Sequence, residues 1–317
     1  MAKKISRVID YLVYLATVAG VYALLGLSLN LLWGMSGMIN MGVVGVFACG
    51  AYASAIVTVK AGWPVAAGWV AGMVVAAVVG FVLAGLTRKM RGDYLAIVTL
   101  GFAEVVRLVA TNEVWLTRGS DGISGIPAPL KSTLGHTGFN FFYAGMTWLI
   151  VALVAWLLAR LFASPYGRAL RALREDPIAA AVAGKRVPRM RLEVFCVSCA
   201  IGGLAGALYG HFTSFISPDL FVPLLTIYVF LTVAVGGVGR PSGPLLGAVV
   251  VMAILEGTRF IGALVPGLSA VQVASLREFV IGAGLIVLLH LRPQGLLPEQ
   301  AVRTSMRNPT KEKNAVR

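Results

Sequence analysis

Two acid–base pairs of identical spacing interrupt the apolar part of the sequence. Glu104 and Arg107 lie three residues apart, and Glu256 and Arg259 repeat that spacing further along the chain. Residues three apart on a helix are neighbours, so each pair can neutralise its own charges. Ionisable groups inside long apolar segments are energetically costly and mark routes for ions or polar solutes. Each pair is therefore either a structural ion pair or part of a translocation pathway.

Asn40 and Tyr52 are uncharged candidates for the same pathway. They lie in or beside residues 34–50, a stretch rich in glycine. Polar side chains at such a place either line an aqueous route or hydrogen-bond to neighbouring helices.

No motif for enzymatic chemistry accompanies these residues. The GxxxxGK(S/T) nucleotide-binding loop and the HExxH and GxSxG motifs of hydrolases are all absent from the sequence. The spacing of His136, His211 and His290 fits no pattern of metal ligands. Cys196 and Cys199 form a CxxC, which within an apolar segment is more typical of two buried thiols than of a redox or metal pair. We expect a protein that is not an enzyme and holds neither metal nor cofactor.

The composition is that of a membrane protein. The 317 residues are 58% hydrophobic and 13% charged, whereas soluble domains are about 45–50% apolar with glycine included and about 25% charged. The net charge of +14 comes from residues between and beside the apolar runs, which is typical of topology signals and lipid head-group contacts. We therefore expect an all-α polytopic membrane protein that contacts lipids and does not bind nucleic acid.

The apolar runs match the length that spans a bilayer and predict about 8–10 transmembrane helices. They fall at residues 11–33, 38–59, 64–86, 94–111, 142–163, 193–212, 221–239, 243–265 and 275–291. The transmembrane domain thus covers residues 11–291, between an N-terminal flank, 1–10, and a basic tail, 292–317. Residues 112–141 and 164–192 are its long polar loops. Stripes of small residues predict close helix packing at Gly68, Gly72 and Gly80, and at Gly202, Gly206 and Gly210.

The loop at residues 164–192 contains a short helix with both ends marked. Asp176 can accept hydrogen bonds from the first free amides, and Pro177 suits the first helical position. Ala179 and Ala180 favour a helix with a smooth surface, and Gly184 can adopt the left-handed conformation that ends it. The loop is either a docking surface or an ordinary positively charged loop.

Positive loops stay on the cytoplasmic side of a membrane. This rule places the N-terminus, residues 87–93, residues 164–192 and the C-terminal tail in the cytoplasm. Three apolar runs then lie between two cytoplasmic positions, so either one run does not cross or the N-terminus is outside. We prefer a broken or re-entrant segment near residues 34–50. The sequence GGVGRPSGP, residues 236–244, is a similar interruption, and paired interruptions indicate a translocation route near the membrane midplane.

Several blocks of sequence, in order, resemble one family. They are LNLLWGMSGMINMGVVGVFACGAYASA, RGDYLAIVTLGFAEVVRLV with RGSDGISGIP, YGRALRALREDPIAAAVAGKRVPRMRLEVFCVSCAIGGLAGALYG, VAVGGVGRPSGPLLGAVV and LRPQGLLP. Together they are similar to LivM-type permease subunits of bacterial branched-chain amino-acid ABC transporters, over residues 11 to 298. Two departures are Arg118, where the family often has glycine, and the pair Lys185 and Arg186.

The resemblance implies an ABC importer permease fold in the bacterial inner membrane. It further implies a second related permease, two ATPase subunits that hold ATP and Mg²⁺, and a periplasmic substrate-binding protein. The family's coupling helix, which docks on the ATPases, falls here on Glu175, Asp176, Pro177, Ala179, Ala180 and Gly184. Urea, short amides or aromatic acids are alternative solutes, because relatives carry them. An ion-coupled secondary transporter is the alternative mechanism; it would need an isolated membrane carboxylate, whereas Glu104 and Glu256 each have an arginine nearby.

Overall fold

The computed structural model describes residues 2–88, 90, 92–264, 270–291 and 294–298. For some residues within these ranges the structure describes the backbone and not the side chain. These are residues 2–7, 132, 136, 258–264, 270, 273, 274, 277, 280, 285, 288, 289 and 291.

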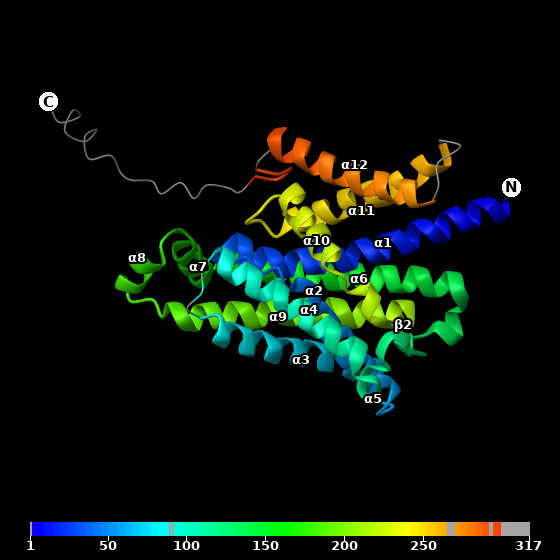
Figure 1. The fold of residues 1–317 in the computed structure, drawn as a ribbon, viewed down its shortest axis with the longest axis horizontal. Helices are drawn as coiled ribbons and strands as arrows, with labels where there is room; N and C mark the ends of the chain where they lie inside the picture. Colours follow the sequence, from blue (N-terminus) through cyan, green and yellow to red (C-terminus); the bar gives the residue numbers. More distant parts are fainter. Residues whose placement is uncertain (1, 89, 91, 265–269, 292–293, 299–317) are drawn as a thin grey trace.

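The described chain is a bundle of α-helices, as expected (Figure 1). The long helices are α1 (Ala2–Asn30), α2 (Val43–Val59), α3 (Val65–Leu86), α4 (Asp93–Asn112), α6 (Lys131–Ala163), α9 (Val187–Thr213), α10 (Pro223–Gly236), α11 (Ser242–Leu264) and α12 (Ala270–Leu291). Shorter helices are the π-helical turn η1 (Leu31–Met35), α5 (Val114–Thr117), η2 (Gly119–Asp121), α7 (Pro165–Glu175), α8 (Pro177–Val182) and η3 (Pro218–Leu220). Strands β1 (Ile123–Ser124) and β2 (Phe215–Ile216) pair antiparallel, with Ile123 opposite Ile216.

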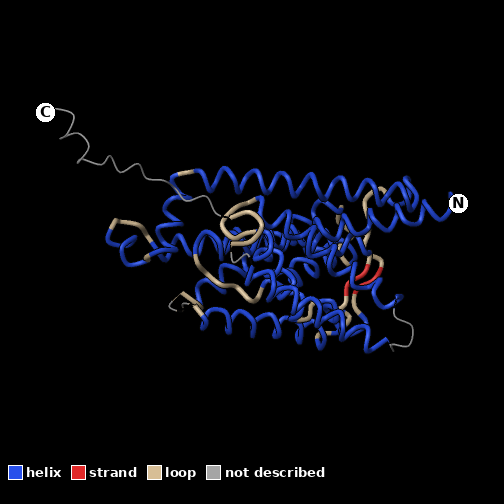
Figure 2. The backbone as a smooth tube through the Cα atoms, turned by 90° about the horizontal axis from the view of Figure 1, so that it is seen from above, coloured by secondary structure: helices blue, strands red, loops and turns tan. Residues whose placement is uncertain are grey.

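Six helical segments of the described chain are long and apolar enough to cross a membrane. They are Val8–Met35, Val65–Leu86, Asp93–Asn112, Thr137–Ala163, Val187–Thr213 and Pro218–Gly236. Val43–Val59 and Ser242–Gly257 are shorter apolar helices of the same bundle. The protein is therefore a multi-pass membrane protein, and the tube in Figure 2 shows its long helices running side by side.

The two ends of the bundle are distinguished by α7 and α8, which project from one of them (Figure 1). We name this the α8 end and the other the far end. The N-terminus lies at the far end, where Thr137 at the start of α6 donates a 3.5 Å hydrogen bond to Asp10. Gly37, just beyond η1, lies against Arg174 of α7 at the α8 end. Helix α1 thus runs the whole length of the bundle.

The next two helices also connect the two ends of the bundle. The segment from Gly37 returns through α2 to the far end, where the ammonium of Lys60 donates to the carbonyls of Trp115 and Leu116 at 2.6 and 2.9 Å. Helix α3 then leads back to Arg88, which lines a small cavity at the α8 end together with Met38. Three helical segments therefore run between the two ends of the bundle before Arg88. The expected break near residues 34–50 is present as η1 and residues 36–42, and the N-terminus lies at the end of the bundle opposite to α8.

Helices α2, α3 and α9 pack with their backbones in contact at the centre of the bundle. A Cβ atom on Gly72 would lie 2.8 Å from the carbonyl oxygen of Gly50, and one on Gly80 would lie 2.7 Å from Cβ of Cys199. A Cβ on Gly206 would collide with the carbonyl oxygen of Phe47. Only glycine allows such approaches. The other predicted packing glycines, Gly68, Gly202 and Gly210, also have side-chain atoms beside them, with more room at Gly202 and Gly210.

Two non-helical segments interrupt the bundle, one after η1 and the other before α10. Residues 36–42 separate η1 from α2, and residues 214–222 between α9 and α10 contain β2 and η3. Thr226 in the first turn of α10 donates to the carbonyl of Met41 at 3.3 Å. The 14 residues of α10 span about 21 Å, less than the hydrocarbon core of a bilayer, because an α-helix rises about 1.5 Å per residue.

The second interruption was predicted at the wrong place. Residues 236–244 form the turn between α10 and α11, and this turn lies at the α8 end rather than at the midplane. There the amide of Gly239 donates to the side chain of Asn30 at 2.8 Å, and Gly34 lies against Gly239. The interruption that pairs with residues 36–42 is the segment 214–222.

Candidate functional site

Helix α8 is held in place by the caps that its sequence predicts. The Asp176 carboxylate accepts hydrogen bonds from the amides of Ile178 and Ala179 at 2.8 and 3.1 Å, and Pro177 occupies the first turn. After Val182 the chain turns through Gly184, which has a φ of +78°. This left-handed residue ends the helix and accommodates the hydrogen bond from Lys185 to the carbonyl of Ala180. Glu175 is the last residue of α7 and is exposed.

The outer surface of α8 is apolar and accessible. Ile178 and Val182 are 66% and 86% exposed, and Ala179 is exposed between them. Ala180, by contrast, is 4% exposed and packs against the rest of the protein. The predicted smooth face therefore exists, but Ala180 is not part of it; Ile178 and Val182 contribute more of its area.

Helix α7 connects α8 to the interior of the bundle. The guanidinium of Arg174 donates to the carbonyl of Gly34 in η1, and its aliphatic stem lies against Gly37. Gly37 has a φ of +70°, a backbone conformation that favours glycine. The first non-helical segment thus begins where α7 contacts η1.

The predicted residue Asn40 stabilises this segment from within. It is 2% exposed, and its side-chain oxygen accepts a hydrogen bond from the amide of Gly42 at 2.9 Å. The next amide, that of Met41, donates to the hydroxyl of Thr99 in α4 at 3.0 Å. These bonds satisfy backbone groups where the helix is interrupted, which non-helical chain at membrane depth requires.

Tyr52 in α2 packs against the second non-helical segment. Its ring centroid is 5.7 Å from that of Phe221, which also contacts Phe47 at 5.4 Å. Tyr52 is 6% exposed, and its hydroxyl has no hydrogen-bond partner among the residues that the structure describes. A buried polar atom of this kind normally has a protein or water partner.

Glu104 and Arg107 form an ion pair on α4. The guanidinium donates through Nε to both carboxylate oxygens at 3.1 Å and through Nη2 to one of them. Their side chains remain 39% and 27% exposed. The expected repeat of this pair is not visible: Glu256 accepts a hydrogen bond from the Tyr11 hydroxyl, and the side chain of Arg259 lies outside the described residues.

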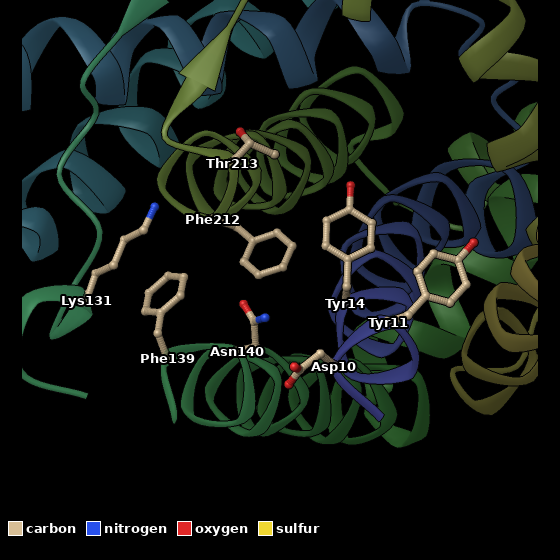
Figure 3. A pocket seen from close by; sticks show the side chains of 8 residues that line it. All are labelled: Asp10, Tyr11, Tyr14, Lys131, Phe139, Asn140, Phe212 and Thr213. Carbon is tan, nitrogen blue, oxygen red and sulfur yellow. The ribbon is translucent and has the colours of Figure 1, made fainter. Parts of the chain in front are cut away.

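A separate cavity of about 490 Å³ opens at the far end. Figure 3 shows its wall of Phe139, Phe212 and Tyr14, with Asp10 and Lys131 on different sides of it. The Lys131 ammonium donates to the Ser214 hydroxyl at 3.1 Å. No predicted pathway residue lines this cavity.

Sequence reasoning did not single out Asp219, Phe221 or Arg174 as functional candidates. Ser217, Pro218 and Asp219 lie directly before an apolar run, a pattern that predicts a turn. This turn signal is the feature of the local sequence that draws attention to Asp219. His211 is fully buried, and its ring contacts the Ser54 hydroxyl at 2.8 Å and the Pro127 carbonyl at 2.6 Å. It serves to fix α2, α9 and the far-end loop to one another.

A polytopic helical bundle with paired interior breaks and an exposed capped helix at one end defines a membrane permease. The chain belongs to the family described as branched-chain amino acid transport system, permease component, whose model matches residues 11–289. The expected family is thereby confirmed.

Several curated proteins are similar to the chain. The high-affinity branched-chain amino acid transport system permease protein LivM of Escherichia coli is 32% identical, over 93% of this chain and 72% of the relative. A probable LivM of Methanocaldococcus jannaschii is 29% identical over 90% and 92% of the two chains. The permease protein LivH of Escherichia coli is 27% identical over 89% and 92%. No solved structure matches the chain.

Proposed function

We propose that this chain is one of two related permease subunits of an ATP-driven importer for branched-chain amino acids. The observation that carries the proposal is the family match, which covers residues 11–289. The names of the relatives extend it, because permeases called LivM and LivH both resemble this chain. A permease of the second kind is the expected partner of this one.

The remaining partners are two ATPase subunits and a periplasmic binding protein. The sequence has no nucleotide-binding loop, so ATP and Mg²⁺ belong to the ATPase subunits. These dock on the apolar outer face of α8, at Ile178, Ala179 and Val182. The binding protein delivers the solute to the far end of the bundle.

The orientation follows from charge. Residues 164–192 carry Arg168, Arg171, Arg174, Lys185, Arg186, Arg189 and Arg191 against Glu175 and Asp176. We infer from this excess that the α8 end faces the cytoplasm, and from the family match that the bundle lies in a bacterial inner membrane. The N-terminus then lies on the periplasmic side, despite Lys3, Lys4 and Arg7, and the chain from residue 294 onwards begins on the cytoplasmic side, where Leu296 bonds to the end of α10.

Transport is driven by movement of α8. When ATP closes the ATPase subunits, α8 and α7 move together, because Asp176 both ends α7 and caps α8. Arg174 transmits this movement to Gly34 and so to the segment 36–42. That segment is bonded to α4 through Thr99 and to α10 through Thr226. A shift at η1 therefore changes the spacing of the two interior breaks, beside which Tyr52, Glu104 and Arg107 line the pathway.

Reconstitution tests this function against its alternatives. The complex with its partner permease, ATPases and binding protein, in proteoliposomes, should accumulate labelled leucine when supplied with ATP. Dissipating the proton gradient should leave that uptake unchanged; uptake that needs a proton gradient and not ATP would contradict the proposal in favour of a secondary transporter. Competition by urea, short amides or aromatic acids in place of leucine, isoleucine and valine would assign the permease to another solute.

A further inference from the structure

The cavity of about 490 Å³ at the far end is lined by residues of α1, α6 and α9. Among the described residues of its wall, one is acidic, Asp10, and one is basic, Lys131. The Lys131 ammonium lies 5.5 Å from the ring centroid of Phe139, which is 6.3 Å from that of Phe212. The Phe212 centroid in turn is 5.4 Å from that of Tyr14, one turn beyond Asp10 on α1 (Figure 3). The cavity therefore presents two opposite charges at the two ends of one aromatic wall.

Neither charge is balanced by an opposite charge among the described residues. The Lys131 ammonium has three N–H donors, and its hydrogen-bond partner is the Ser214 hydroxyl at 3.1 Å. Oδ2 of Asp10 accepts a long bond of 3.5 Å from Thr137 at an exposed position, and the buried Oδ1 has no hydrogen-bond partner in the described part of the chain. No ion pair of the described side chains includes either residue. A ligand with a donating cation for Oδ2 and an accepting anion for the ammonium would complete both ends of the wall.

The cavity lies at the depth at which two membrane spans begin. The span Val8–Met35 carries Asp10 and Tyr14 in its first two turns, and the span Thr137–Ala163 carries Phe139 in its first turn. Lys131 comes shortly before that second span. Tyrosine rings and flanking lysines at the start of a span are typical of the level of the lipid head groups. The cavity therefore opens into the head-group layer at the far end of the bundle.

We propose that this cavity binds the phosphoethanolamine head group of a phospholipid, with its primary ammonium at Asp10 and its phosphate at Lys131. The Tyr14 and Phe212 rings offer the ammonium aromatic faces, which attract cations. The volume of about 490 Å³ suits a small ligand, because such sites measure about 300–1,000 Å³. A free amino acid carries the same two charges, but the depth of the cavity favours the lipid, since head groups fill that layer. The inference goes beyond transport, because the lipid joins α1, α6 and α9 at the far end whichever solute the permease carries.

The site distinguishes between head groups. A phosphocholine group carries a positive charge but no N–H donor, so it can lie against the rings and cannot donate to Asp10. A phosphoglycerol group brings a negative charge alone and leaves the Asp10 carboxylate uncompensated beside an apolar wall, which is costly. The expected order of affinity is therefore phosphatidylethanolamine, then phosphatidylcholine, then phosphatidylglycerol.

The test uses the purified full-length chain with the subunits that co-purify with it, and measures the binding of short-chain forms of the three lipids by native mass spectrometry. Wild type should bind phosphatidylethanolamine about tenfold more tightly than phosphatidylglycerol, as expected for one charge-assisted hydrogen bond. Asp10→Asn should abolish this preference, and Asp10→Glu, which keeps the carboxylate, should retain part of it. Lys131→Gln should weaken both lipids by a similar factor, because both present a phosphate. The matched control is Asp121→Asn, an exposed carboxylate of η2 outside the cavity, which should keep the preference.

Three outcomes overturn the inference. Equal affinity of the wild type for all three lipids leaves the ammonium without a role. Loss of the preference in Asp121→Asn as well as in Asp10→Asn assigns it to the net charge of the protein and not to the cavity. Leucine that binds without the binding protein, is lost in Asp10→Asn and is not displaced by phosphatidylethanolamine makes the occupant a soluble zwitterion. A melting temperature of Asp10→Asn equal to that of wild type in lipid-free detergent shows that the loss is one of binding and not of folding.

Discussion

The guanidinium of Arg174 in α7 donates a hydrogen bond to the carbonyl oxygen of Gly34 in the π-helical turn that follows α1. One bond therefore joins the hairpin of α7 and α8 to the place where α1 ends. π-helical turns are frequent at functional sites because they shift the register of a helix. The contact provides a direct route from α8 to the interior breaks.

Arg174→Ala removes this route. We expect uptake to fall about tenfold while the ATPases still hydrolyse ATP, because a hydrogen bond from a charged group contributes about 1.5–3 kcal/mol. Transport and hydrolysis measured on the same proteoliposomes check this. Arg168→Ala, an exposed residue of the same helix, is the control and should transport normally; equal effects of both variants would refute the route.

The outer and inner faces of α8 should respond differently to the same substitution. Val182→Glu, at a position that is 86% exposed, should weaken co-purification of the ATPases without changing the melting temperature of the permease. Ala180→Glu, at 4% exposure, should lower the melting temperature, because burial of an unpaired carboxylate destabilises a fold. Normal ATPase binding by Val182→Glu would show that docking uses another surface.

The cap of α8 makes a measurable contribution. Asp176→Ala removes the acceptor for the amides of Ile178 and Ala179, and loss of such a cap costs about 1 kcal/mol. Hydrogen exchange at these two amides should become faster by about fivefold. Glu175→Ala, the neighbouring carboxylate, serves as the control, and unchanged exchange in Asp176→Ala would contradict the cap.

Two glycines of α3 form a matched pair for the backbone contact. Gly72→Ala places a methyl group 2.8 Å from the Gly50 carbonyl oxygen and should cost about 1–3 kcal/mol by overpacking. Gly85→Ala, with no atom within 4 Å of the new methyl group, should be neutral or stabilise by up to about 1 kcal/mol, since alanine favours helix. Thermal unfolding of the purified permease distinguishes them, and equal melting temperatures would exclude the close approach.

The side of the membrane on which the N-terminus lies can be tested by cysteine labelling. In a protein whose three natural cysteines are replaced by serine, Val8→Cys and Val182→Cys should react with a membrane-impermeant maleimide from opposite sides. Both positions are exposed, at 55% and 86%. Reaction from the same side would restore the topology in which the N-terminus is cytoplasmic.

The sequence predicted the features that depend on neighbouring residues. Asp176, Pro177 and Gly184 mark a short helix because each acts on backbone groups within a few positions. The side of the membrane on which the N-terminus lies stays a prediction, because Lys3 and Lys4 carry the same sign of charge as the long basic loop at the opposite end of the bundle. Positive charge biases orientation statistically, whereas the number of passes fixes it.

The features that the sequence did not predict depend on tertiary contacts. Glycines at 236–244 predict a break, but Gly236 and Gly243 instead let α10 and α11 approach closely, and the two uses of glycine look alike in sequence. The turn η3 contacts α4 only because the segment 214–222 folds back against it. These elements are far apart in the sequence and no sequence pattern predicts their contact, so only the structure shows it.

The glycine contacts among α2, α3 and α9 limit where the protein can change shape. Backbones that touch leave no slack for one of these helices to slide past another without a steric clash. The same holds between α2 and α4, because a Cβ atom on Gly45 would lie 2.7 Å from the Cα atom of Ala103. We therefore expect changes of backbone conformation during transport in the non-helical segments 36–42 and 214–222, and not at the contacts among these helices.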